Sequence, residues 1–241
     1  MKVYGRTNLY GYTIGILVIE GYFPRLPGAI GNATTFPFPV LQRVVKGATG
    51  GRVVREPSQE IISSYIEGAR ELEAQGARAI TTSCGFTAMF QRELAEAVDV
   101  PVFASSLLLA PLISRMLKKK ERVGIVTADA RNITPRHYEG VGIDPDRVIL
   151  GGMEECPEFE EVVFQDKHEL DVERMEAEVV GVATRLVTEH PEVRALLLEC
   201  SLLPPFSKAV QEATQLPVFD FTTLVTMVHS SFLRKPFDGY L

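Results

Sequence analysis

The chain has 241 residues, 46% of them hydrophobic and 23% charged, which is the composition of an ordinary soluble globular protein. Its net charge of −6 argues against nucleic acid or an anionic membrane as a partner. Three cysteines without a Cys-x-x-Cys pair indicate free thiols in a reducing compartment, not a disulfide framework. The first residues lack the apolar core of a signal peptide, and no stretch is long enough for a membrane span, so we expect a cytoplasmic protein.

Apolar runs and apolar stripes at helical spacing alternate along the chain. In the first half we expect strands at 12–20, 40–45, 79–83 and 102–104, and helices at 58–75, 86–98 and 107–118. In the second half we expect strands at 122–127, 147–150, 193–199 and 218–221, and helices at 135–140, 171–189, 205–214 and 223–233. Alternation of this kind predicts βαβ units and an α/β fold built on parallel sheets.

An internal repeat divides the chain into two similar units. Matching residues lie 116 positions apart (200 − 84 = 116) without a gap: Arg78 and Arg194, Cys84 and Cys200, Pro101 and Pro217. The repeat predicts two pseudo-symmetric α/β lobes with a shared cleft. We expect the first lobe to hold residues 1–108 together with 217–241, and the second to hold 109–216, because the last strand and helix are expected to return to the first lobe.

Cys84 and Cys200 each follow an apolar strand and precede a helix. The carboxyl ends of parallel strands form the ligand-binding edge of such sheets, so we expect the two thiols to face each other across the cleft. A helix N-terminus there lowers a thiol pKa and favours thiolate near neutral pH. None of the four histidines follows a strand, which disfavours a cysteine–histidine nucleophile. Paired thiols instead suit removal of a proton from carbon on one face and its return on the other.

The third cysteine, Cys156, has no counterpart in the repeat and is expected to be structural. No cluster of His, Cys, Asp and Glu has metal-ligand spacing, and no lysine lies in a phosphate-binding glycine loop. We therefore expect neither a metal nor a cofactor.

The sequence resembles the aspartate/glutamate/hydantoin racemase superfamily over most of its length. The resemblance rests on Thr82-Ser83-Cys84-Gly85, on Glu199-Cys200-Ser201, on Gly124-Ile125-Val126-Thr127 and on the duplicated plan. It implies two lobes with the active site between them and Cys84 and Cys200 as a paired acid and base, without pyridoxal phosphate. Arylmalonate decarboxylase, a relative, keeps one of the two cysteines, so the presence of both favours racemisation.

This chain departs from the glutamate racemase pattern at three places. It has Gly85-Phe86 where those enzymes commonly have Asn-Thr, Ser201 where family members often have Thr, and Glu20-Gly21 where they have Asp-Ser. A strict glutamate racemase is therefore not expected.

A substrate carboxylate prefers backbone N–H groups and hydroxyls at helix N-termini. The residues expected to bind the substrate stand at such junctions, or, for Asn32, in the long glycine-rich loop of 21–38: Asn32, Thr82, Ser83, Gly85, Phe86, Thr127 and Ser201. Ser105 and Ser106 end another strand and are expected near the same cleft.

Several functions remain open on the sequence. The first is a cofactor-independent racemase or epimerase acting on an amino acid or similar carboxylate, a small-molecule substrate, in a homo-oligomer. The alternatives are a maleate-type cis–trans isomerase, a hydantoin racemase, and a two-lobed binding protein that is not an enzyme.

Overall fold

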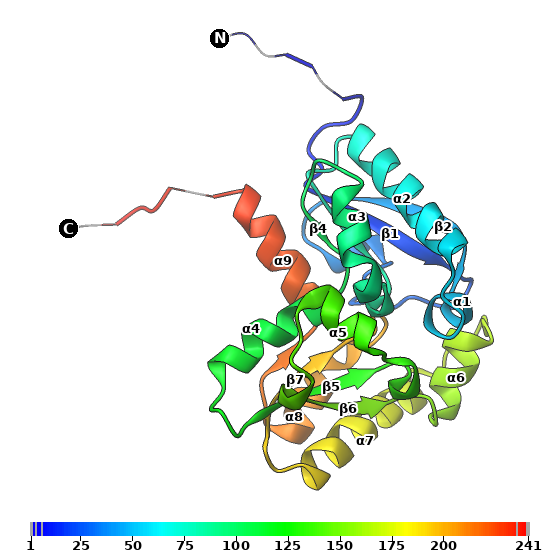
Figure 1. Cartoon of the computed structure of the whole chain (residues 1–241), viewed down its shortest axis with the longest axis vertical. Coiled ribbons are helices and arrows are strands. Elements are labelled where there is room, and N and C mark those ends of the chain that lie inside the picture. The colour runs from blue at the N-terminus through cyan, green and yellow to red at the C-terminus, as the bar shows by residue number, and fades with distance from the viewer. Residues whose placement is uncertain (1, 3, 6, 235, 240–241) are drawn as a thin grey trace.

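The computed structural model describes residues 2, 4–5, 7–234 and 236–239, and it has two lobes, each built on a four-stranded parallel sheet (Figure 1). The first sheet has the order β2-β1-β3-β4 and the second the order β6-β5-β7-β8. The strands are β1 (Ile14–Glu20), β2 (Val40–Thr49), β3 (Ala79–Thr82), β4 (Val102–Phe103), β5 (Arg122–Thr127), β6 (Val148–Gly152), β7 (Val193–Leu198) and β8 (Val218–Phe219). The α/β fold with two parallel-sheet lobes is thereby confirmed.

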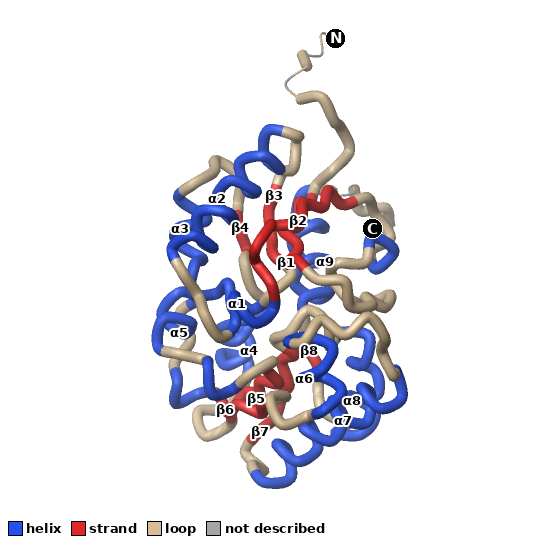
Figure 2. Tube along the Cα trace, turned by 90° about the vertical axis from the view of Figure 1, so that its right-hand side faces the viewer, coloured by secondary structure: helices blue, strands red, loops and turns tan. Residues whose placement is uncertain are grey.

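Helices cover the sheets in both lobes (Figure 2). They are α1 (Gly50–Val54), α2 (Gln59–Ala74), α3 (Gln91–Glu96), α4 (Leu109–Met116), α5 (Pro135–Val141), α6 (Pro157–Phe164), α7 (Val172–Glu189), α8 (Ser207–Thr214) and α9 (Phe221–Phe232). The two long helices start where expected, since the side chains of Ser58 and Asp171 accept N–H groups of their first turns. Helices α1 and α6 were not predicted. No helix of the described residues is long and apolar enough to cross a membrane.

The repeat seen in the sequence is also present in the pairing of the strands, because equivalent residues pair in the two sheets. In the first sheet Ile80 pairs with Val102, and in the second Leu196 pairs with Val218. Both members of the second pair lie 116 positions after those of the first (196 − 80 and 218 − 102), so the offset between the cysteines is also the offset between the two sheets.

The expectation that the last strand returns to the first lobe is wrong. Strand β8 pairs with β7 and forms the edge of the second sheet, because it is the repeat's counterpart of β4, which forms the edge of the first. Helix α9 does reach the first lobe: the Arg78 guanidinium lies 4.8 Å from the Phe232 ring centroid, and Phe38 stacks on His229. Helix α4 correspondingly packs on β5 and β7 of the second lobe (Figure 1). Each lobe thus receives a helix from the other.

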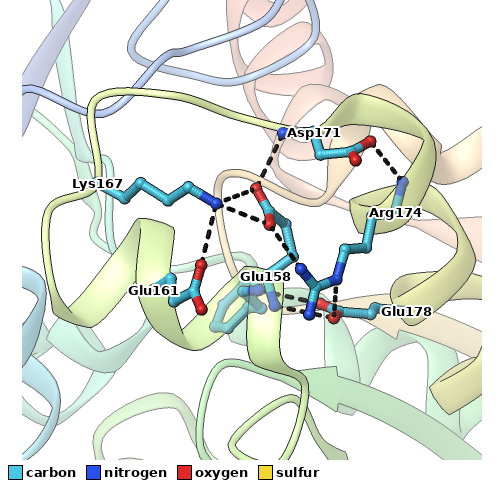
Figure 3. A network of polar contacts seen from close by, with 7 residues as sticks. Glu158, Glu161, Lys167, Asp171, Arg174 and Glu178 are labelled. Carbon is cyan, nitrogen blue, oxygen red and sulfur yellow. Dashed lines mark hydrogen bonds and ion pairs between the residues drawn. The ribbon is translucent and has the colours of Figure 1, made fainter.

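A polar network fixes the segment that joins α6 to α7. Lys167 and Arg174 converge on the fully buried carboxylate of Glu158, which also accepts the Asp171 N–H (Figure 3). The segment carries Asp166, whose Oδ1 accepts the N–H groups of Tyr22 and Phe23 in the first lobe at 2.7 and 3.1 Å. The network therefore holds Asp166 where it can accept these two N–H groups, and this contact links the second lobe to the loop after β1.

Candidate active site

The two strand-end cysteines are equivalently placed. Cys84 follows β3 and caps the 3-10 helix Gly85–Phe90, and Cys200 lies two residues after the end of β7. The two residues are 7% and 8% exposed, and both belong to the buried core that spans the two lobes. Backbone N–H groups at the start of the following turn favour each thiolate, those of Phe86 and Thr87 for Cys84 and that of Leu202 for Cys200.

Direct hydrogen bonds join the two cysteine segments across the lobe boundary. The Ser201 hydroxyl donates to the Ser83 carbonyl at 2.6 Å. The Ser106 hydroxyl, from the first lobe, is within 3.2 Å of the Leu198 carbonyl and 3.1 Å of the Glu199 carbonyl. The Ile30 N–H in the first long loop donates to the Ser201 carbonyl at 3.3 Å. The fold thus brings the two predicted thiols together between the lobes.

In this structure, burial works against the thiolate that the sequence predicts near neutral pH. Burial raises the pKa of Cys84 most, and the nearby Glu199 carboxylate raises it further. Burial and Glu199 likewise raise the pKa of Cys200 well above its usual value. The helix-start N–H groups act in the predicted direction, but desolvation outweighs them because a buried charge loses its hydration.

Glu199 is the residue at this site that the sequence reasoning missed. It is fully buried, and its Oε2 accepts the Thr127 hydroxyl at 2.8 Å and the Ala128 N–H at 3.0 Å. Its Oε1 has no hydrogen-bond partner among the described residues. Burial raises the pKa of Glu199 to about 7, although its two donors favour the ionised form. The available signal was a single acidic residue at the end of a largely apolar strand, directly before Cys200.

The hydroxyls predicted to bind substrate have partners within the protein. Thr82 Oγ1 accepts the Cys84 N–H at 3.1 Å and lies 2.8 Å from the Ala104 carbonyl. Ser83 Oγ accepts the Ile19 N–H, and Thr127 holds Glu199. In this structure these side chains, like Ser201, form hydrogen bonds that link the ends of neighbouring strands.

The remaining predicted binding residues differ in place. Phe86 is fully buried, with its ring edge-on to His137 at 5.0 Å between centroids. Asn32 lies in the first loop, where its Oδ1 caps a 3-10 turn through the Thr34 N–H and its Nδ2 donates to the Arg25 carbonyl. Gly85 faces the Glu199 carboxyl.

Tyr65 adds a second unpartnered polar atom near Cys84. It comes from the buried stripe of α2, and its hydroxyl has no hydrogen-bond partner within the described part of the chain. Burial raises the pKa of Tyr65 well above its usual value, and the charge of Cys84 raises it further. In the described ranges, no three His, Cys, Asp or Glu side chains are grouped to hold a metal ion.

Comparisons with known proteins agree with this architecture. The family model described as Asp/Glu/Hydantoin racemase matches residues 45–227. Dimethylsulfoniopropionate lyase 7 of Emiliania huxleyi is 32% identical over 237 residues, which cover 94% of this chain and 69% of that protein. A dimethylsulfoniopropionate lyase of Durusdinium sp. clade D is 30% identical over 243 residues, covering 96% of this chain and 79% of that protein.

Solved structures of lower identity share the fold. A glycine-to-cysteine mutant of arylmalonate decarboxylase in a sulfate-associated form has a TM-score of 0.56 at 20% identity, covering 90% of this chain and 93% of that chain. An aspartate racemase homologue from Pyrococcus horikoshii OT3 has a TM-score of 0.57 at 16% identity, covering 90% and 99%. With the family model matched over most of its length, this chain belongs to the Asp/Glu/hydantoin racemase family.

Proposed function

We propose that this chain is a cofactor-independent enzyme that uses the Cys84–Cys200 pair to remove a proton from the carbon next to a carboxylate, and that its reaction is β-elimination from a small sulfonium carboxylate of the dimethylsulfoniopropionate type. The observation that carries the proposal is the meeting of two buried thiols from opposite lobes, whose neighbours Ser83 and Ser201 are joined by a hydrogen bond of 2.6 Å. A substrate between them would meet a thiol on each face.

The elimination needs one base. A thiolate takes the proton from the carbon beside the carboxylate, the electron pair of that C–H bond forms the carbon–carbon double bond, and the bond from the next carbon to sulfur breaks. The sulfur keeps the electrons of that bond, so dimethyl sulfide leaves neutral and acrylate remains. The leaving group requires no proton, and the thiol later returns its proton to solvent.

Two features support this reaction over others of the family. Dimethylsulfoniopropionate lyases are 30–32% identical to nearly the whole of this chain. The site between the lobes is enclosed by apolar side chains, and such an environment strengthens the interaction between a thiolate and a cationic sulfonium group.

Amino-acid racemisation is the second candidate. The specific observation in its favour is the second thiol, which a one-base elimination leaves without a proton to transfer. An amino acid without a leaving group on the next carbon would form the same carbanion. The opposite thiol would then supply a proton to the other face, as the two-base mechanism requires. The proposed partner in both cases is a small carboxylate, and a homo-oligomer stays a prediction.

One experiment in deuterated water separates the candidates. The purified protein is incubated with dimethylsulfoniopropionate and, separately, with enantiopure amino acids. Equimolar dimethyl sulfide and acrylate, measured by gas chromatography and NMR, support the lyase. Deuterium uptake with inversion, measured by chiral mass spectrometry, supports the racemase. Cys84→Ser and Cys200→Ser serve as matched controls, and product formation that survives both would overturn a thiol mechanism.

A further inference from the structure

Glu199 is an acidic group built into the boundary between the two cysteines. Its Oε2 is held by two donors of the second lobe, Thr127 and Ala128. Its Oε1 is directed at the peptide that follows Cys84 in the first lobe, because a β-carbon placed on Gly85 would lie 2.0 Å from it. The carboxyl directly precedes Cys200 in sequence and faces the residue after Cys84, and its charge raises the pKa of both thiols.

Few other charges face this carboxyl. Asp129 follows Ala128 but is paired with Arg55 at 3.2 Å, and Tyr65 faces Cys84. His137, from α5, packs against Phe86, and burial lowers its pKa to about 4, so it is neutral near pH 7. No cation pairs with Glu199 among the described residues. The titrating groups of the site are therefore Glu199 and the two thiols.

A buried site of this kind tolerates one negative charge far better than two. Each added charge loses its hydration, and two like charges at short range repel in a medium of low dielectric constant. One charge is accommodated by the N–H groups already aimed at Glu199, Cys84 and Cys200. A thiolate therefore forms most readily when the carboxyl is neutral.

We propose that Glu199, Cys84 and Cys200 share a single negative charge, and that Glu199 takes up the proton that a thiol gives up when the working thiolate forms. The step is a proton transfer in which a Cys S–H bond breaks and a carboxyl O–H bond forms, with no change in net charge. Glu199 therefore acts through the thiols, by holding the proton that one of them releases. The inference deepens the proposed thiol chemistry, but it does not depend on which substrate is used.

The shared charge has a distinctive pH dependence. While Glu199 is neutral, the thiolate fraction rises about tenfold for each pH unit. Once Glu199 ionises, the thiolate and carboxylate forms carry the same charge, so their ratio no longer changes with pH. Thiol reactivity should then level off from about pH 7, where Glu199 titrates. A lone buried thiol would instead continue to rise.

The test is alkylation of Cys84 and Cys200 by iodoacetamide from pH 5 to pH 10, followed by peptide mass spectrometry. Wild type should reach its plateau near pH 7. Glu199→Gln keeps the shape, with the amide oxygen able to accept the Ala128 N–H, and its alkylation should keep rising. At pH 9, two units above the plateau's start, the variant should react about a hundredfold faster than wild type.

Two further variants make the test specific. Thr127→Val removes one donor to the carboxylate and should move the start of the plateau up by about one pH unit. Tyr65→Phe removes the unpartnered hydroxyl beside Cys84 without altering charge and should leave the plateau where it is. Carbon-13 NMR of labelled cysteine reads the thiolate fraction at equilibrium, so it decides the question if burial of the two thiols keeps the reagent out.

The outcomes separate this inference from the proposed function. Parallel pH profiles in wild type and Glu199→Gln would overturn the shared charge, whatever the protein does to dimethylsulfoniopropionate. A plateau that Glu199→Gln abolishes and Thr127→Val shifts would support it, even if the enzyme proves to act on a different carboxylate.

Discussion

The Glu199 carboxyl fills the space that a side chain at residue 85 would need. A β-carbon on Gly85 would lie 2.0 Å from Oε1 and 2.6 Å from the Cγ and Cδ atoms of Glu199. Real β-carbons do not approach other atoms so closely, so any side chain on Gly85 would have to displace the carboxyl of a residue 114 positions later (199 − 85). The two lobes are complementary at the residue that follows the first cysteine.

Gly85→Ala should therefore destabilise the protein. The added carbon would push the carboxyl away from Thr127 and Ala128, and overpacking of this kind costs about 1–3 kcal/mol of unfolding free energy. Urea unfolding at one pH measures it. Gly51→Ala is the matched control, since a β-carbon at Gly51 meets no atom within 4 Å. Equal stability of the two variants would contradict the close contact.

The division of labour between the thiols can be read from single substitutions. In a two-base racemisation, Cys84→Ser and Cys200→Ser should each lower turnover by about a hundredfold or more, because a serine hydroxyl is a far weaker acid and does not form the base near neutral pH. In the one-base elimination, a loss of this size is expected for only the cysteine that acts as the base. If the substrate is a chiral amino acid, each variant keeps one thiol and should exchange the proton of one enantiomer without inverting it. Deuterium exchange in separate D and L samples measures this, and substantial racemisation by Cys84→Ser would rule out the paired mechanism.

The raised pKa of Glu199 makes its contribution to stability depend on pH. The pKa of Glu199 is about 7 in the folded protein, against 4.5 for an ordinary glutamate such as that of the unfolded chain. The unfolded chain therefore releases this proton at lower pH than the folded protein. The contribution is complete below about pH 4.5 and is lost as pH rises through 7, a loss of about 3 kcal/mol in all. Unfolding in urea at pH 5 and pH 8 should thus show wild type losing stability relative to Glu199→Gln.

His137 titrates with the opposite sign and serves as an internal comparison. Burial lowers its pKa from 6.5 to about 4, so the unfolded chain binds the proton more readily and stability falls as pH drops from about 6.5 to 4. His137 is present in both wild type and Glu199→Gln, so the difference between the two proteins isolates the carboxyl. If the free energy of unfolding of both proteins changed equally between pH 5 and pH 8, Glu199 would not titrate in that range.

Asp166 is expected to govern how readily the lobes separate. It is one of two non-glycine residues with positive φ in the described part of the chain, at 54°, and it accepts two N–H groups from the first lobe. Asp166→Gly keeps the backbone conformation without strain but loses the acceptor. The Tyr22 and Phe23 amides should then exchange with deuterated water about tenfold faster. Asp166→Asn keeps an acceptor oxygen and is the control; matching exchange in both variants would assign the contact no role.

The sequence predicted the fold well where the signal was periodic or repeated. Apolar runs located the strands, and the constant offset between Cys84 and Cys200 predicted two equivalent lobes, down to the register that the two sheets share. The expected place of the strand at Val218 was wrong because it rested on the edge of the first sheet, whereas the repeat makes this strand an edge of the second.

Two properties of the site lay beyond the sequence for a physical reason. Helix-start N–H groups can be foreseen from strand and helix positions. The burial that raises the pKa of Cys84 more than these groups lower it depends on how the two lobes pack together. Glu199 was visible as a lone acidic residue at a strand end, yet its contact with Gly85 arises only from the packing of one lobe on the other.

The exchange of α4 and α9 between the lobes bears on how such a chain could originate. One repeat alone leaves a sheet face uncovered, because the helix that follows its edge strand lies on the other unit. Two separate copies of a half-length ancestor would cover those faces by swapping the helix, giving a dimer with a two-fold axis and one cysteine from each copy at the shared site. Fusion of the two genes would then free the copies to diverge, so that glycine follows the cysteine in one copy and glutamate precedes it in the other.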